Sequence, residues 1–276
     1  MDNPELHTWN YIERLYAQVH GLCKQDIGRL DLARPFLDGH ASRIDAARIQ
    51  KYIDHLLGQG MAPSTVNRYL VPIKVALKLA HRHKVITEVP YIPTLKEPPA
   101  KTRWLTHEEA QRLIDALPKH LSDAAVVGLM TGLREANITG LRWENVDLTR
   151  ATAWVDGSQT KNRQNLAVPL PVEALAVLTR RWREAGKPKA GPVFTVHGHR
   201  LHRMSTPAWY AATKKIGLDG VTPHTLRHTW ASWHVMAGTD PLTLMQLGGW
   251  KSVKMVQRYT HLSSDHLADA AKRIAL

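Results

Sequence analysis

Hydrophobic residues recur at helical spacing along the first 86 residues of the chain. Between Ser64 and His83 they lie three and four positions apart, at Val66, Leu70, Ile73, Leu77 and Ala80. A stripe of this kind is typical of an amphipathic helix that packs on a core. Pro72 falls inside the helix and is expected to bend or locally break it, because proline removes one backbone hydrogen bond. The pattern predicts a small all-helical domain.

Prolines mark a boundary after this domain. Four of them fall within ten residues, at Pro90, Pro93, Pro98 and Pro99. Proline fixes φ and lacks an N–H donor, so residues 87–103 are predicted to form an extended linker. The 276 residues of the chain suffice for two domains of about 100–200 residues each. We therefore expect one domain at 1–86 and a second at 104–276.

The second domain is predicted to be mainly helical with one small antiparallel sheet. Thr106 and Glu109 have the spacing of a capping box, in which each side chain binds the other residue's backbone N–H at a helix start. Alternating apolar residues predict strands at 151–156 and 166–170, on either side of a polar turn. Further helices are predicted from Ser122 to a break near Gly132, and at 171–185, 206–216 and 223–236. The fold class is thus mainly α with a small antiparallel β-sheet.

The predicted helix at 223–236 separates apolar from polar side chains. Thr222 suits its N-cap and Pro223 its first helical position. Its apolar side contains Leu226, Trp230 and Trp233, whereas the opposite side contains His224, Arg227, His228 and Ala231. Because the apolar side packs on the core, the His and Arg side chains are expected to face away from it.

Composition favours a nucleic-acid partner. The chain has 37 Lys and Arg against 24 Asp and Glu, a net charge of +13 that both halves share, and its pI is near 10.0. Such charge neutralises phosphates, although a merely soluble basic protein would carry it too. The single Cys23 excludes an intramolecular disulfide and indicates a reducing compartment. The N-terminus lacks a signal-peptide pattern and no apolar run has membrane-spanning length, so we expect a cytoplasmic protein with no membrane partner.

Six residues in five short motifs follow an order that is typical of one kind of active site. They are Arg134 in Thr-Gly-Leu-Arg, Lys161 in Gln-Thr-Lys-Asn, His224 and Arg227 in His-x-x-Arg, Trp250 in Gly-Gly-Trp, and Tyr259 in Gln-Arg-Tyr-Thr-His. Taken alone, each has an ordinary interpretation, such as a packed aromatic ring or a solvated Lys. Taken together, they resemble the active site of the tyrosine recombinases, the phage-type integrases that cut and rejoin DNA through a phosphotyrosine.

These residue types suit phosphodiester chemistry. The transition state spreads negative charge over the phosphate oxygens, and guanidinium groups match that geometry with bidentate donors. Arg134 and Arg227 would bind the scissile phosphate from two sides. His224 would donate to a non-bridging oxygen or accept the nucleophile's proton, and the Trp250 indole N–H is a donor that does not titrate.

The resemblance implies the remaining roles. Tyr259 would attack phosphorus, leaving a 3′-phosphotyrosine and a free 5′-hydroxyl, and Lys161 would protonate the leaving oxygen. The helical domain resembles a core DNA-binding domain, which closes around DNA together with the catalytic domain. A tail helix after Ser263 would dock into a neighbouring subunit of a homotetramer on double-stranded recombination sites. A monomer in free solution and a DNA-bending accessory protein as partner are further expectations from the family.

The sequence departs from the family's usual pattern at three points. Asn137 stands where the family usually has an acidic residue, three positions after the first Arg. Trp250 stands where the family often has His. A domain of the kind that reads distant arm sites is not recognised ahead of the helical domain. The protein is therefore expected either to use core sites only or to be part of a longer chain.

Other interpretations of the same motifs lead to different functions. A type IB topoisomerase shares the chemistry, but the Leu-Arg-His-Thr context around Arg227 is integrase-like. A DNA-binding accessory protein with a decayed active site would explain Asn137. The 16 His residues include a group at His197, His199 and His202. However, no His-Glu-x-x-His or paired Cys pattern provides zinc ligands, so we expect no metal or other cofactor.

Overall fold

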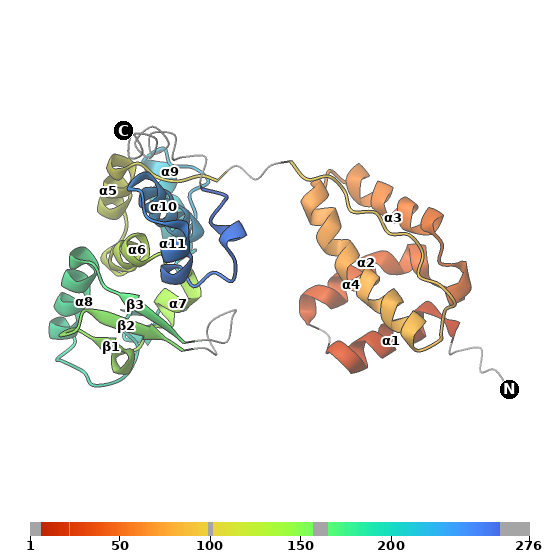
Figure 1. The fold of residues 1–276 in the computed structure, drawn as a ribbon, viewed down its shortest axis with the longest axis horizontal. Helices are drawn as coiled ribbons and strands as arrows, with labels where there is room; N and C mark the ends of the chain where they lie inside the picture. Colours follow the sequence, from red (N-terminus) through yellow and green to blue (C-terminus); the bar gives the residue numbers. More distant parts are fainter. Residues whose placement is uncertain (1–6, 22, 99–101, 157–164, 260–276) are drawn as a thin grey trace, which may run out of the picture. The chain divides into compact units, whose positions relative to one another are not determined.

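The structure is a computed structural model that describes residues 7–21, 23–98, 102–156 and 165–259. The chain divides into two compact units, residues 1–100 and 101–276 (Figure 1). The predicted tail helix after Ser263 lies outside the described residues, as does Lys161. Within the described part of the chain, no helix has the length and apolar character needed to span a membrane.

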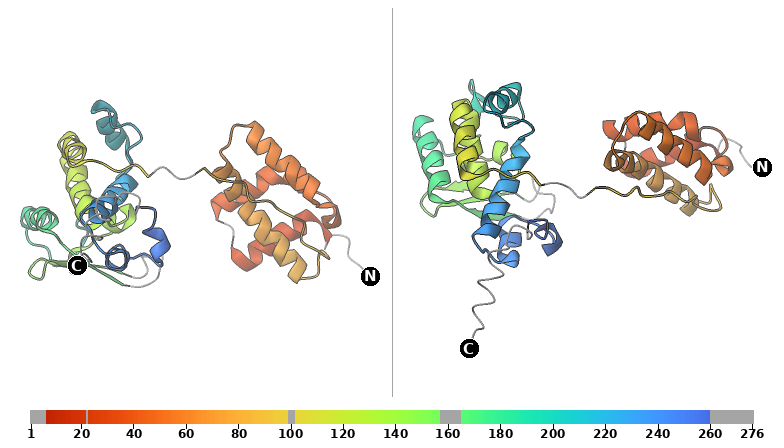
Figure 2. Two further views of the ribbon diagram at one scale, coloured as in Figure 1. Left: turned by 45° about the horizontal axis from the view of Figure 1, so that its top comes forward. Right: turned by 90° about the horizontal axis from the view of Figure 1, so that it is seen from above.

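Unit 1 consists of helices around one core, in agreement with the predicted all-helical domain. The helices are α1 (Trp9–His20), α2 (Lys24–Leu37), α3 (Ala46–Gly58) and α4 (Pro63–Arg82), with a short 3-10 turn, η2 (Ala41–Arg43) (Figures 1 and 2). Helix α4 contacts each of the other three. Its residues Leu70, Ile73 and Leu77 are fully buried, so the apolar stripe seen in the sequence forms the centre of this core.

The sequence predicted a bend or a local break at Pro72; helix α4 runs without interruption past this residue, so a break does not occur. Pro72 is itself buried, between the fully buried side chains of Leu70 and Ile73. Packing of this face against three helices stabilises α4 and offsets the one backbone hydrogen bond that proline removes.

The first part of the predicted linker packs along α4. The Asn67 side chain donates to the Leu95 carbonyl (2.9 Å) and accepts from the Leu95 N–H (2.8 Å). The Lys74 ammonium donates to the Pro93 carbonyl at 3.2 Å. Residues up to Leu95 are therefore extended, as expected, but they belong to unit 1 rather than to a free connection.

Unit 2 is built around α6. Its helices are α5 (His107–Ala116), α6 (Lys119–Thr131), α7 (Glu135–Thr139), α8 (Val172–Glu184), α9 (Pro207–Lys215), α10 (Pro223–Met236) and α11 (Pro241–Leu247), with 3-10 turns η3 (Trp143–Asn145) and η5 (Val253–Met255). Helix α6 contacts α5, α7, α8 and α10, and its buried side chains include Leu121, Ala124 and Leu129.

Local capping signals mark the starts of α5 and α10. The Thr106 hydroxyl accepts from the Glu109 N–H at 3.1 Å, and the Glu109 carboxylate accepts from the Thr106 N–H at 3.0 Å, which confirms the capping box. Helix α10 has Thr222 as its N-cap and Pro223 first, also as predicted. Helix α6 begins at Lys119, three residues before the predicted Ser122, because Pro118 takes the N-cap position.

Within the residues that the structure describes, two small antiparallel sheets accompany the helices, where the sequence predicted one. The first has the order β1 (Val146–Asp147), β2 (Thr152–Val155), β3 (Leu166–Pro169), and β2 and β3 match the two predicted strands. The second joins β4 (Thr195–Val196) to β5 (His199–Arg200) through His197 and Gly198, which both have positive φ. Strands of two residues are too short to show an alternating pattern, which is why β1, β4 and β5 were missed.

A buried ion pair connects α6 to α8. Asp123 on α6 is 5% exposed and accepts from Arg180 at 2.5 Å and from Arg181 at 2.9 Å. Both carboxylate oxygens are thereby satisfied, as a buried charge requires. These ion pairs hold α8, the helix that follows β3, against α6.

Candidate active site

A cavity of about 250 Å³ opens among the loops of unit 2. It is lined by residues from four segments, among them Arg134, Asn137, Arg227, Gln246 and Trp250. The cavity thus brings together three of the six residues that the sequence selected. They come from the start of α7, the second turn of α10 and the loop after α11.

Arg227 is held in one orientation by two backbone carbonyls. Its side chain is 4% exposed, and its two terminal nitrogens donate to the Gly132 and Gly248 carbonyls, each at 2.5 Å. These carbonyls stand at the ends of α6 and α11. Arg227 therefore leaves the apolar face of α10, as predicted, but it is buried between two loops rather than directed into solvent.

Gly132 allows the loop after α6 to lie close to α10. It ends α6 in the left-handed conformation, with φ of 63°, and a Cβ at this position would lie 2.2 Å from the Trp230 ring. Only glycine fits so close to an indole at positive φ. The loop after α6 can consequently lie against α10, where its carbonyl accepts from Arg227.

The two arginines concentrate positive charge at the cavity. Burial lowers the pKa of Arg134, which is half-buried. Burial and the neighbouring Arg134 lower the pKa of Arg227 to about 10, so both side chains remain charged at neutral pH. Among the described residues neither arginine forms a salt bridge. Two charged guanidinium groups without an acidic partner favour binding of an anion with several oxygens.

The neighbouring Glu135 does not neutralise Arg134. The Glu135 carboxylate accepts from the Met204 N–H, the Ser205 N–H and the Ser205 hydroxyl, at 2.5 to 3.1 Å. It therefore fixes the start of α7 to the loop before α9. Asn137 is buried at the cavity and brings no negative charge.

Tyr259 lies in an aromatic cluster beside the cavity. The ring is 3% exposed, and its centre is 6.0 Å from that of Trp250. Burial raises the pKa of Tyr259, while Arg227 and Arg258 act in the opposite direction. The hydroxyl is therefore protonated at neutral pH, and it must lose a proton before or during any nucleophilic attack.

His228 is the site residue that the sequence did not single out. Its Nδ1 lies 2.6 Å from the Tyr259 hydroxyl, although the two residues are 31 positions apart. His224 is exposed on the first turn of α10, with its ring 4.6 Å from that of His228. The only signal in the sequence was the four-residue spacing that places His228 beside His224 and next to Arg227.

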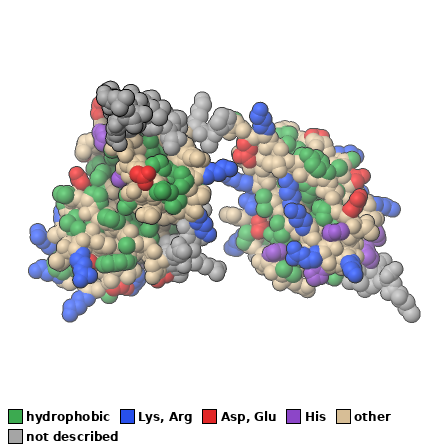
Figure 3. Space-filling model, viewed as in Figure 1, with side chains coloured by type: hydrophobic (Ala, Val, Ile, Leu, Met, Phe, Trp, Pro, Cys, Tyr) green, Lys and Arg blue, Asp and Glu red, His purple; other side chains and the backbone are tan. Residues whose placement is uncertain are grey.

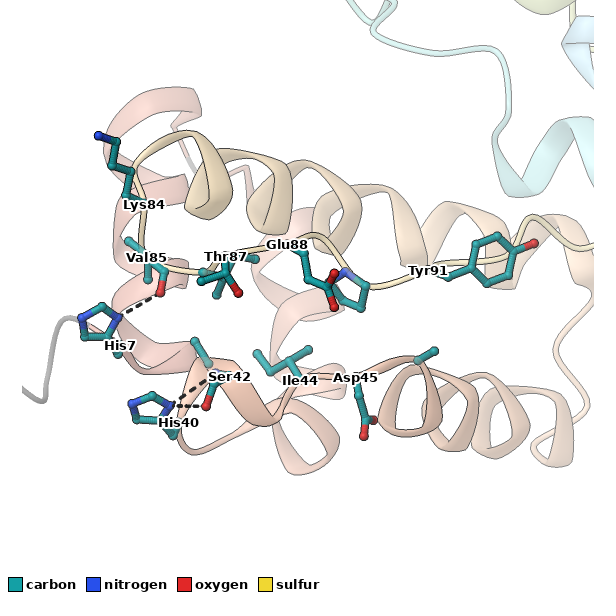
Figure 4. Close-up of a pocket in the computed structure, with 14 residues that line it drawn as sticks. His7, His40, Ser42, Ile44, Asp45, Lys84, Val85, Thr87, Glu88 and Tyr91 are labelled. Carbon is teal, nitrogen blue, oxygen red and sulfur yellow. Dashed lines mark hydrogen bonds between the residues drawn. The ribbon is translucent and has the colours of Figure 1, made fainter.

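A larger cavity of about 480 Å³ lies in unit 1, between the end of α4 and the start of α3 (Figure 4). His7 binds the Val85 carbonyl there (2.9 Å), and His40 binds the Ser42 hydroxyl (2.7 Å). Its Lys84 is accompanied by the acidic Asp45 and Glu88, so it lacks the concentrated positive charge seen in unit 2. Across the described residues, no three His, Cys, Asp or Glu side chains are placed to hold a metal ion.

Comparisons with known proteins agree with the geometry of unit 2. Residues 103–266 match the model of the phage integrase family. The integrase of Salmonella phage P22 is 35% identical over 224 residues, which are 77% of this chain and 58% of that protein. The tyrosine recombinase XerD of Lacticaseibacillus casei is 32% identical over 246 residues, 81% of this chain and 80% of the relative. The chain thus spans less than two thirds of the phage P22 protein.

Solved structures show the same fold. The Tn1549 transposon integrase, in complex with a circular intermediate DNA, has a TM-score of 0.78 at 19% identity. The superposition covers 98% of this chain and 100% of that one. A lambda integrase dimer bound to a COC′ core site has a TM-score of 0.76 at 18% identity, over 93% of this chain and 78% of that one.

Proposed function

The chain belongs to the phage integrase family of tyrosine recombinases, and we propose that it is a site-specific DNA recombinase that cuts and rejoins strands through a 3′-phosphotyrosine. The observation that carries the proposal is the pair of charged, partly or fully buried arginines at a cavity that adjoins a buried tyrosine. The matched range, 103–266, includes all six residues selected from the sequence.

In this proposal, Arg134 and Arg227 bind the scissile phosphate. Arg227 is already oriented by the Gly132 and Gly248 carbonyls, so little conformational freedom is lost when DNA binds. The charge that develops on the phosphate oxygens is then stabilised by the two guanidinium groups, of which that of Arg227 is fixed in orientation, and by the Trp250 indole N–H. The two guanidinium groups provide the positive charge that a metal ion provides in many nucleases.

Tyr259 is the proposed nucleophile. Its hydroxyl oxygen forms a bond to phosphorus as the bond from phosphorus to the 5′ oxygen breaks, and a histidine beside it takes the phenolic proton. Lys161 is assigned to protonate the 5′ oxygen, on the basis of its motif alone. The phosphotyrosine conserves the energy of the phosphodiester bond, so a new 5′-hydroxyl can attack it and reseal the strand.

Unit 1 is proposed to hold the DNA at the core of each site. Basic side chains are distributed over the visible surfaces of both units (Figure 3), and both halves of the chain carry a net positive charge. By analogy with the lambda integrase tetramer bound to a Holliday junction, which has a TM-score of 0.77, we propose a homotetramer on two sites. A monomer in free solution, a DNA-bending accessory protein and a cytoplasmic location belong to the same proposal.

The proposal is tested by trapping the protein on a library of nicked duplexes and sequencing the DNA that stays covalently attached. A nick next to the cleavage point lets the short 5′-ended strand diffuse away, so the adduct accumulates. A recombinase should select one core sequence from the library and then exchange strands between two copies of it. Relaxation of supercoils without exchange would instead indicate a topoisomerase, and specific binding without an adduct would indicate an accessory protein.

A further inference from the structure

The nucleophile proposed above already has a hydrogen-bond partner in the structure. The Nδ1 of His228 and the hydroxyl oxygen of Tyr259 are 2.6 Å apart, a short distance for this kind of contact. His228 is half-buried on α10, and Tyr259 is nearly inaccessible to solvent. Water therefore competes poorly for the phenolic proton, and the imidazole is the acceptor already in place.

We propose that His228 receives the proton of Tyr259 during strand cleavage, and that His224 contacts a phosphate oxygen instead. This inference rests on the proposed function, because it requires Tyr259 to be the nucleophile. As the bond from the Tyr259 oxygen to phosphorus forms, the hydroxyl proton moves to His228 Nδ1 and the bond to the 5′ oxygen breaks. In the sealing step the same proton returns to Tyr259 as the phosphotyrosine bond breaks.

The charges around His228 agree with this role. The groups that face it are His224 and Arg227 on α10, and Arg258 and Tyr259 after η5. Burial, followed by His224, Arg227 and Arg258, lowers the pKa of His228 to about 4. The ring is thus neutral at pH 7, with its proton on Nε2 when Nδ1 accepts from the tyrosine.

Binding of DNA would make the same imidazole more basic. A phosphate held by Arg134 and Arg227 places negative charge close to His228. This negative charge offsets the positive charge of Arg227, which disfavours the protonated form of His228. The proton acceptor is therefore weak in the free protein and becomes stronger when a phosphate occupies the cavity. This links removal of the tyrosine proton to the presence of substrate.

A structural role is the main alternative, because the same hydrogen bond also holds Tyr259 in position. The two roles differ in their dependence on pH. A proton acceptor must be unprotonated, so cleavage should slow as pH falls through the pKa of His228 in the DNA complex, which we expect between about 4 and the ordinary value of about 6.5. This decrease in cleavage rate at low pH is the acid limb of the pH profile. A residue that only positions the Tyr259 ring leaves the acid limb unchanged.

The experiment measures single-turnover formation of the covalent adduct on a nicked duplex, from pH 4 to 9, with the full chain. The variants are His228→Gln, His228→Ala and His224→Gln. His234→Gln serves as the matched control, since His234 lies on the same helix, is half-buried and binds the Thr239 hydroxyl at 2.9 Å. Melting temperature and DNA affinity are measured for each variant to exclude unfolding.

We expect His228→Gln to slow adduct formation by roughly 10²- to 10⁴-fold at pH 7 and to abolish the acid limb. Added imidazole should restore part of the rate of His228→Ala, because a free base can enter the space left by the ring. His224→Gln should be slower but keep the acid limb, and His234→Gln should match the wild type.

Two results would overturn the inference while leaving the proposed function intact. In the first, His228→Gln forms the Tyr259 adduct at nearly the wild-type rate. In the second, it is slow but keeps the acid limb, and imidazole does not restore His228→Ala, which would assign His228 to positioning only. If the wild-type chain forms no adduct through Tyr259 at any pH, the proposed function fails and the inference fails with it.

Discussion

The guanidinium of Arg227 lies 4.5 Å from the centre of the Trp250 ring. The face of the indole therefore supports the cation, in addition to the two carbonyls that fix its orientation. This contact gives Trp250 a role that does not depend on its N–H. A cation over an aromatic face at a buried site contributes on the order of 2 kcal/mol.

Trp250→Phe should therefore keep measurable activity, whereas Trp250→Ala should lose nearly all of it. Phe retains an aromatic face but not the N–H donor, so we expect adduct formation to slow by roughly tenfold, the equivalent of one hydrogen bond of about 1.4 kcal/mol. Ala removes the support for Arg227 and leaves a cavity that costs about 3 kcal/mol of stability. Adduct rates and urea unfolding of both variants check this. Equal losses in the two variants would show that the N–H is the essential group.

The ion pairs of Asp123 with Arg180 and Arg181 should stabilise the fold without affecting the rate of strand cleavage. Asp123→Ala leaves the largely buried Arg181 without its partner, so we expect a loss of roughly 3 to 5 kcal/mol in the free energy of unfolding. Glu184→Ala, which removes only exposed pairs with Lys119 and Arg180, should change it by less than about 1 kcal/mol. Chemical denaturation measures both. A small effect of Asp123→Ala would mean that α8 is held by its apolar contacts alone.

Stability should fall as the solution is made acidic. The pKa of His228 is lowered to about 4, and burial also lowers those of His234 and His120. In the unfolded chain these residues titrate near 6.5. The unfolded state therefore binds more protons between pH 6.5 and 4, so unfolding becomes easier as pH falls through this window.

For His228, which is partly exposed, we expect this contribution to reach about 1 to 2 kcal/mol near pH 4. Urea unfolding at a series of pH values would detect it. In His228→Gln the slope between pH 6.5 and 4 should be shallower than in the wild type. An identical slope would mean that the folded protein does not disfavour the charged imidazole.

The parts of the fold that the sequence predicted are those fixed by neighbouring residues. Thr222 and Pro223 define the start of α10 through local capping, and the Thr106 box does the same for α5. The alternation at 166–170 was long enough to indicate β3. The two-residue strands around His197 carry no such pattern, and the continuity of α4 at Pro72 depends on three other helices that the local sequence does not contain.

The same distinction applies to the candidate site. The motifs selected Arg227 and Tyr259 one by one, but a helical projection assigned Arg227 to an open face. A projection of one helix cannot include the loops at Gly132 and Gly248. These loops come from distant segments, and they bury the Arg227 side chain. The contact between His228 and Tyr259 likewise depends on how the chain returns after α11. Lys161 lies outside the described residues, so its role stays a prediction.

Covalent linkage of Tyr259 to DNA is tested most directly by mass spectrometry of the trapped adduct. The wild-type chain and Tyr259→Phe are incubated with the same nicked duplex in the presence of a chelator, denatured and digested. Tyr259→Phe removes one oxygen, so folding and DNA affinity should change by no more than about 1 kcal/mol. We expect a nucleotide on the peptide that contains Tyr259 in the wild type, and no denaturant-resistant adduct in the variant. An adduct that persists in Tyr259→Phe, or that maps to another residue such as Tyr210, would contradict the account.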